Sequence, residues 1–313
     1  MNAVKSCGMM KPLIRSYYSM ESRPVNNLGD ILGPHILDAL GYAYAPLTAP
    51  DAGVVNPGRC LLVVGSLLTA RKLKDFPWPM DVWGCGWKGR ELAAGISGDF
   101  RWLAVRGPET ASGFGLPSTT PLGDPALLLP HLIQLPVTRH NRTIVIPHMD
   151  RLKSMHASDR CLETGCAEAL STVVCPPNIG QLWRRSLPRE SAGLFYRRVR
   201  YGVRVRGLWS TVSRIAGAAF VLTGSLHGAI LAQAYGVPWA AYDDGYVDAP
   251  AKWQDWAAYL GIEIDHVKTL EAGRRWWEKT GARGRIRSLR PLLKSFPYPI
   301  LSLNARRLIE DLP

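Results

Sequence analysis

Residues 219–242 read AFVLTGSLHGAILAQAYGVPWAAY, and no other stretch of the chain says more about its fold. A short apolar run, Phe220 to Leu222, is followed by a Thr-Gly-Ser turn and by a helix-like segment from Gly228 to Tyr235. Gly236 ends that segment, and a second apolar run, Val237 to Ala241, follows it. The pattern predicts strand, turn, helix and strand, which is one βαβ unit of a parallel sheet.

His227 lies where the turn meets the helix. In open α/β sheets ligands gather outside the carboxyl ends of the strands, and the free N–H groups of a helix N-terminus favour anions. An imidazole titrates near neutral pH, so His227 is either a general acid or base beside an anionic ligand or a structural histidine.

The same region carries no charge from Ile215 to Tyr242, which is long enough for a membrane span. Its polar residues, its glycines and a proline favour a buried α/β core instead.

The length of 313 residues suggests two domains, and the apolar fraction of 47% is enough for real cores. A polar, proline-containing stretch near residues 134–142 marks the expected boundary. We therefore expect an N-terminal domain over 1–138, a C-terminal domain over 139–285, and a proline-broken tail over 286–313 that packs back on the first domain. No export signal is recognisable, which favours a cytoplasmic location.

The formal net charge of +13 predicts an acidic partner. Basic residues gather at 184–206 and at 274–294, either as solvated helix faces or as a surface for phospholipid or a diphosphate-linked substrate. No nucleic-acid-binding module is present, so nucleic acid is not expected. The six cysteines form no CxxC pair and have no histidine at zinc spacing, so we expect structural thiols and no metal.

Further strand-and-turn units precede and follow residues 219–242. They lie at residues 60–68, 81–86, 101–106 and 143–146. Neither GxGxxG nor a Walker lysine occurs in the early units, so they do not by themselves predict a nucleotide site. Their repetition predicts parallel, doubly wound sheets.

Polar residues in the turns are the candidate site. Asn27, Gly29 and Asp30 form a polar turn before a predicted helix, where Asp30 either caps the helix or belongs to a loop that approaches a ligand. Arg106 follows a strand, and its guanidinium could bind a carboxylate or phosphate or form an interdomain ion pair. Lys252 is a candidate for a second positive charge.

These turns, taken in order, resemble the polysaccharide pyruvyl transferase family. The matching pieces are Asn27-Leu28-Gly29-Asp30, Val105-Arg106-Gly107-Pro108-Glu109-Thr110, Gly123-Asp124-Pro125-Ala126, Thr223-Gly224-Ser225-Leu226-His227-Gly228-Ala229, Gly236-Val237-Pro238-Trp239 and Lys252-Trp253. The resemblance spans residues 25–261 and is greatest to the succinoglycan-type ketal pyruvyl transferases. Members of other branches carry an arginine at the position of Ser225, so the sequence does not identify the residue that anchors the donor phosphate in this chain.

The resemblance implies two Rossmann-like domains with parallel sheets in a GT-B-like arrangement. The active site would lie in the interdomain cleft, with the acceptor on the N-terminal side and the donor on the C-terminal side. Phosphoenolpyruvate would donate pyruvate to a sugar of a lipid-linked diphosphate repeat unit, giving a pyruvate ketal and phosphate without a cofactor. The enzyme would work in the cytoplasm, in peripheral contact with the anionic inner face of the plasma membrane.

On this hypothesis His227 and Asp30 are catalytic, with Asp124 as the other candidate for partner base. The expected substrate-binding residues are Arg106, Asn27, Gly29, Ser225, Leu226, Gly228 and Lys252. Two other functions fit the pattern: a GT-B-like glycosyltransferase that uses a sugar nucleotide, and a non-catalytic binding protein of exopolysaccharide assembly.

Overall fold

The computed structural model describes residues 11–17, 26–45, 53–73, 76, 78–148 and 208–312. Strands are also assigned at 168–169 and 173–174. The side chains of those strands and of Asn26, Asn27 and Asp30 are outside the description. The basic cluster expected at 184–206 lies outside the described residues as well.

Residues 219–242 form β10 (Phe220–Thr223), α9 (Leu226–Ala234) and β11 (Trp239–Tyr242). Strand β10 pairs in parallel with β11 and, on its other side, with β7 (Thr143–Ile146). The strands β12 and β8 complete a five-stranded sheet of order β12-β11-β10-β7-β8. All its pairings are parallel, so the predicted βαβ unit and parallel sheet are confirmed.

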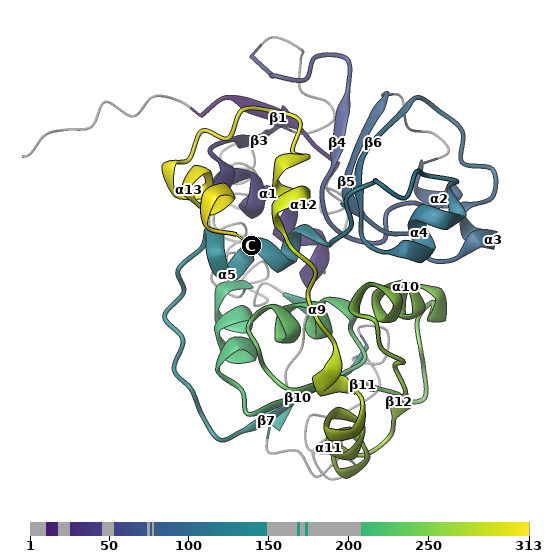
Figure 1. Ribbon diagram of the computed structural model, residues 1–313, viewed down its shortest axis with the longest axis vertical. Helices are drawn as coiled ribbons and strands as arrows, with labels where there is room; N and C mark the ends of the chain where they lie inside the picture. Colours follow the sequence, from purple (N-terminus) through teal and green to yellow (C-terminus); the bar gives the residue numbers. More distant parts are fainter. Residues whose placement is uncertain are drawn as a thin grey trace, which may run out of the picture.

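The first half of the chain builds a second parallel sheet (Figure 1). Its strands are β1 (Leu13–Arg15), β3 (Ala43–Ala45), β4 (Cys60–Leu62), β5 (Met80–Cys85) and β6 (Phe100–Val105). The pair β1-β3 and the sheet β4-β5-β6 are joined by an isolated parallel bridge between Ser16 and Leu61. The resulting order is β3-β1-β4-β5-β6.

Both sheets therefore place their first strand between the second and the third. This is a doubly wound order, in which the chain reverses direction across the sheet at one point, and ligands bind at the carboxyl ends of the two strands that flank it. In the second sheet those strands are β7 and β10. The chain leaves β7 through Pro147 and His148, and leaves β10 through the turn that carries His227.

The remaining elements connect and cover the sheets. They are β2 (Asn26–Asn27), α1 (Leu28–Leu40), α2 (Ala70–Leu73), α3 (Arg90–Ala93), α4 (Pro108–Gly113), η1 (Pro125–Leu128), α5 (Leu129–Leu132), β8 (Glu168–Ala169), β9 (Val173–Val174), a helix over 208–217, α10 (Pro250–Leu260), β12 (His266–Val267), α11 (Leu270–Lys279), η2 (Gly281–Arg283), α12 (Arg290–Lys294) and α13 (Leu303–Asp311). Residues 133–142 contain neither helix nor strand.

The region around residue 30 differs from the prediction. Helix α1 begins at Leu28, so Gly29 and Asp30 lie in its first turn and not in a polar turn before it. Asn26 and Asn27 form β2, which pairs antiparallel with Val173–Val174 of β9. The expectation failed because strand pairing to a distant segment extends the chain up to Asn27, a contact that local sequence does not encode.

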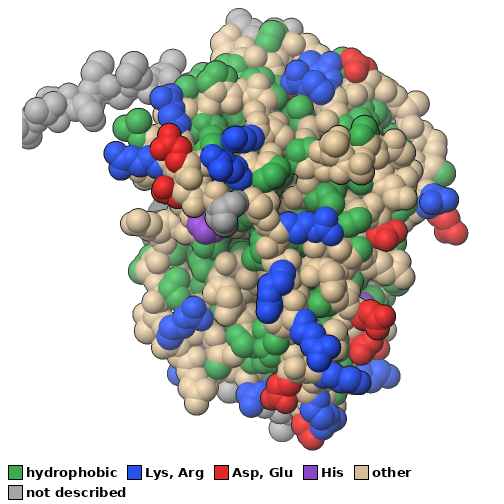
Figure 2. Space-filling model, in the orientation of Figure 1, with side chains coloured by type: hydrophobic (Ala, Val, Ile, Leu, Met, Phe, Trp, Pro, Cys, Tyr) green, Lys and Arg blue, Asp and Glu red, His purple; other side chains and the backbone are tan. Residues whose placement is uncertain are grey.

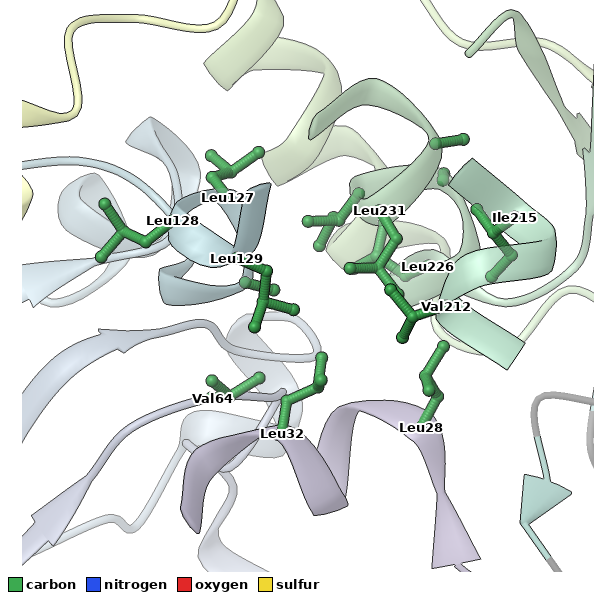
Figure 3. Close-up of a cluster of buried hydrophobic side chains, with 14 of the residues drawn as sticks. Leu28, Leu32, Val64, Leu127, Leu128, Leu129, Val212, Ile215, Leu226 and Leu231 are labelled. Carbon is green, nitrogen blue, oxygen red and sulfur yellow. The ribbon is translucent and has the colours of Figure 1, made fainter. Parts of the chain in front are cut away.

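One apolar cluster runs through both halves of the molecule. In Figure 3, Leu28 and Leu32 of α1 face Leu129, beside the end of η1, and Leu226 and Leu231 of α9. The residues that precede Gly29 and His227 in sequence are thus anchored in the same core. A smaller cluster lies around β4, β5 and β6.

The tail from residue 286 contacts the first half of the chain. The Trp83 indole donates a hydrogen bond to the Leu292 carbonyl at 2.9 Å, and the Leu301 amide donates to the Leu40 carbonyl at 3.0 Å. Helix α13 also packs beside α5 (Figure 1). Among the described helices, none has the length and apolar character needed to cross a bilayer.

Candidate functional site

The turn after β10 fixes the position of His227. The Thr223 hydroxyl accepts a hydrogen bond from the Ser225 amide at 3.0 Å and donates to the Ser225 carbonyl at 2.9 Å. Ser225 is the N-cap of α9 with extended backbone, and its side chain makes no cap hydrogen bond. His227 follows in the first turn of the helix and is 6% exposed.

Two neighbours of His227 have packing roles in the structure. Leu226 is buried and points into the apolar cluster of Figure 3. A Cβ atom on Gly228 would lie 2.4 Å from the Thr223 hydroxyl oxygen, so only glycine lets α9 cross the end of β10 here. Their predicted contact with substrate stays a prediction, as does that of Ser225.

Asp124 is the carboxylate that faces His227. Its Oδ2 lies 3.5 Å from His227 Nε2, and both side chains are buried. Its Oδ1 accepts a hydrogen bond from the Ala126 amide at 3.0 Å, which makes Asp124 the N-cap of η1. Among the described residues neither Oδ2 nor Nε2 has a hydrogen-bond partner. A protonated His227 would form an ion pair with this carboxylate, so Asp124 is both a turn residue and a partner of the imidazole.

The first turn of α1 lies against the other side of the imidazole ring. A Cβ atom on Gly29 would lie 2.2 Å from both Nδ1 and Cε1 of His227. The structure therefore brings two predicted site residues, Gly29 and His227, into contact. The catalytic role of Asp30 and the substrate contact of Asn27 stay predictions, because the description leaves out both side chains.

Arg106 is fully buried in the structure. Its Nε donates to Asp255 at 3.2 Å, one terminal nitrogen donates to the Ser66 hydroxyl at 2.8 Å, and the other donates to the Trp87 carbonyl at 3.1 Å. Asp255 also accepts from the amide and hydroxyl of Thr110 at 2.9 and 2.8 Å. This network connects α10 to the ends of β4, β5 and β6. Arg106 therefore forms the ion pair that was one of its two expected roles. Substrate contact of Arg106 stays a prediction.

Lys252 lies in the first turn of α10, where its ammonium donates to Asp248 at 2.6 Å. Burial lowers the pKa of Lys252 from 10.5 to about 8, against the opposing effect of Asp248. Lys88, which follows β5, donates to the same carboxylate at 3.1 Å. Both lysines therefore present charge where the two halves of the chain meet.

Sequence reasoning missed Asp248, Asp255 and Lys88. The sequence did contain a signal for Asp255, which lies on the same helix face as Trp256 and Lys252. A carboxylate on a buried helix face requires a hydrogen-bonding or charged partner. Asp248 and Lys88 left no comparable signal. Among the described residues no group of three or more His, Cys, Asp or Glu could hold a metal ion.

The parallel α/β fold is consistent with the Rossmann-like class, and the His227–Asp124 pair lies at the reversal point of its second sheet. Residues 27–245 match the model of the polysaccharide pyruvyl transferase family, and the chain belongs to that family. It is 26% identical over 281 residues to the succinoglycan biosynthesis protein ExoV of Rhizobium meliloti (strain 1021), covering 86% of this chain and 73% of that protein. The chain is thus a polysaccharide pyruvyl transferase.

Proposed function

We infer that this enzyme transfers pyruvate from phosphoenolpyruvate to a sugar of an exopolysaccharide repeat unit. The product is a pyruvate ketal, and phosphate is released. The observation that carries the inference is the His227–Asp124 pair, which lies against Gly29 at the reversal point of the second sheet. Family membership and the similarity to a succinoglycan biosynthesis protein support the reaction class.

The reaction needs a group that gives a proton and a group that accepts the hydroxyl protons, and an imidazole can do either. In the first half, C3 of phosphoenolpyruvate gains a proton, and a sugar hydroxyl adds to C2 while losing its own. In the second half, the C2–O bond to phosphate breaks, a second hydroxyl of the same sugar adds to C2, and the proton of that hydroxyl is removed. We assign proton transfer to His227, while the Asp124 carboxylate stabilises the imidazolium form.

The arrangement of the two sheets supports a GT-B-like architecture with the site between two Rossmann-like lobes. Each sheet has the doubly wound strand order. Side chains at the carboxyl ends of the first sheet pair with α10 and its preceding loop in the second half: Arg106 with Asp255, and Lys88 with Asp248. Those pairs fit lobes whose strand ends face each other.

The acceptor we propose is a lipid-linked diphosphate oligosaccharide at an anionic membrane. Exposed arginines and lysines gather over α11 and the segment after it, where Figure 2 shows several blue side chains on one face. Such a surface is attracted to anionic headgroups. Its contact with a membrane is part of the proposal, together with a cytoplasmic location.

Purified protein, phosphoenolpyruvate and a pyruvate-free saccharide acceptor test the proposal by phosphate release. The proposal predicts acceptor-dependent release, no hydrolysis of sugar nucleotides, and a pyruvate ketal in the product. His227→Gln should lower kcat by about 100-fold or more, which is the usual contribution of a general acid or base. His131→Gln, at an exposed histidine, is the matched control. If the protein consumes sugar nucleotides and does not use phosphoenolpyruvate, the proposed function is wrong and the chain is a glycosyltransferase.

A further inference from the structure

Asp248 is surrounded by three groups that can carry positive charge. Its carboxylate lies 2.6 Å from the Lys252 ammonium, 3.1 Å from the Lys88 ammonium and 3.6 Å from His148 Nε2. The four residues come from three places in the fold: the end of β5, the end of β7, and the start of α10 with the loop before it. The cluster therefore joins the carboxyl ends of both sheets.

Among the described side chains, three groups that can carry positive charge face the carboxylate of Asp248. They are two ammonium groups and an imidazole, whereas the Arg106 guanidinium next to Lys252 has its own counter-ion in Asp255. A second carboxylate, Asp244, accepts a hydrogen bond from the backbone amide of His148. Several cationic donors that converge on one displaceable carboxylate are what a site for a doubly negative anion requires.

Solvent reaches part of the cluster. The Lys252 side chain is 8% exposed, whereas those of Asp248 and Lys88 are 18% and 29% exposed. An anion could therefore reach the ammonium groups by displacing the Asp248 carboxylate toward solvent. Ala249, the next residue, has φ 46°, the only positive φ of a non-glycine residue among those described. Backbone strain of this kind is concentrated in ligand clamps and switch regions.

The cluster lies next to the turn that leads to the histidine of the candidate active site. A Cβ atom on Gly224 would lie 2.9 Å from the backbone nitrogen of His148, so the turn that leads to His227 contacts the end of β7. The His148 amide also donates to Asp244 at 2.9 Å, which fixes the loop after β11 beside it. An anion held by this cluster would sit beside the turn that carries His227.

We propose that Lys88, His148 and Lys252 form a binding site for a phosphate group, and that the Asp248 carboxylate occupies this site in the ligand-free enzyme. The phosphate oxygens would take over the hydrogen bonds that Asp248 now accepts. The assignment of the phosphate to a substrate rests on the proposed function; the anion site itself does not. The phosphate belongs either to phosphoenolpyruvate or to the diphosphate of the acceptor.

Binding of inorganic phosphate by the full chain tests the site directly. Titration calorimetry should show phosphate binding that Lys88→Met and Lys252→Met each weaken by about tenfold or more, as expected for loss of a charge-assisted hydrogen bond. Lys252→Arg keeps the charge and should retain binding. Lys268→Met, at an exposed lysine beyond β12, is the control. Equal phosphate affinity in folded Lys88→Met, Lys252→Met and wild-type protein would overturn the proposal.

The Asp248→Asn variant tests whether the Asp248 carboxylate competes with phosphate for the two lysines or only stabilises the folded protein. Without phosphate this variant should melt below the wild type, because the two ammonium groups lose their counter-ion. Phosphate should bind it about tenfold more tightly and raise its melting temperature more than that of the wild type. Weaker phosphate binding by Asp248→Asn, with no larger thermal stabilisation by phosphate, would show that the carboxylate does not compete.

The source of the phosphate and the reaction itself are tested in separate measurements. Competitive inhibition by phosphate against phosphoenolpyruvate would assign the site to the donor, whereas displacement of phosphate by a short prenyl diphosphate alone would assign it to the acceptor. If the lysine variants lose phosphate binding but no pyruvyl transfer is found, the anion site stands and the proposed function fails. If transfer proceeds and Lys252→Met leaves both phosphate binding and the KM values unchanged, the site fails and the function stands.

Discussion

Replacing Gly29 with alanine puts one methyl group against the imidazole of His227. The new Cβ would lie 2.2 Å from Nδ1 and Cε1, whereas ordinary van der Waals contact begins at 3.4 Å. The ring, the start of α1, or both must therefore move by more than 1 Å. Alanine favours a helix over glycine by up to about 1 kcal/mol, while overpacking a buried site costs about 1–3 kcal/mol. We expect a net destabilisation of about 0–3 kcal/mol.

The effect on turnover should be larger than the effect on stability. A catalytic group displaced by about 1 Å can lose about 100-fold in rate, which corresponds to about 2.7 kcal/mol in the activation free energy. Phosphate release from phosphoenolpyruvate in the presence of acceptor measures kcat, and urea denaturation measures the free energy of unfolding. The expected result is a folded protein with kcat reduced by about 100-fold.

Gly33→Ala is the matched control in the same helix. Its Cβ would meet only Val63, at 3.7 Å, which is an ordinary contact. The helix-propensity gain is partly offset by Pro34, because a proline disfavours the helical conformation of the residue before it. We expect kcat to stay at the wild-type value. A Gly29→Ala enzyme that works within about threefold of the wild type would show that a fixed imidazole is not needed, since a 1 Å displacement should matter far more.

Three further predictions follow from the buried charges. Asp255→Asn leaves Arg106 without its counter-ion and should lower the free energy of unfolding by about 3–5 kcal/mol in urea titrations; a loss below about 1 kcal/mol would contradict the structural role of the pair. Asp124→Asn should lower kcat by about 10-fold or more with little change in KM, because it removes the carboxylate that supports the protonated form of His227; steady-state kinetics decides, and a change confined to KM would refute it. Phosphate affinity should fall as the pH rises through about 8, because burial lowers the pKa of Lys252 from 10.5 to about 8 and the ammonium loses its charge there; calorimetry at several pH values above neutrality checks this, and Lys252→Arg should remove the decline.

Local patterns predicted much of the fold. The strands that end at Thr223 and Ile146 and the helix that Gly261 terminates appear where apolar runs, turn residues and helix breakers indicated them. These signals succeed because hydrophobic periodicity and turn chemistry act over a few residues. The start of α1 was misplaced because β2 forms by pairing with a strand more than a hundred residues away.

The candidate site was only partly accessible to the same reasoning. His227 and Lys252 could be selected from their positions after a strand and at a helix start. The partners could not: Asp124 had two plausible roles, and Asp248 looked like an ordinary loop residue. Only the structure shows that one of these carboxylates faces the imidazole and that the other lies among the cationic side chains.

The sequence by itself determined the βαβ unit, the parallel α/β class and the pyruvyl transferase family, since these follow from short-range patterns and the order of motifs. Tertiary structure alone decided which side chains meet. It placed Arg106 in a buried ion pair with Asp255, set Gly29 against His227, and gathered Lys88, His148 and Lys252 around one carboxylate. The physical reason is that charge pairing and close backbone approach depend on distances between segments far apart in the chain, which become fixed only when the shared core packs.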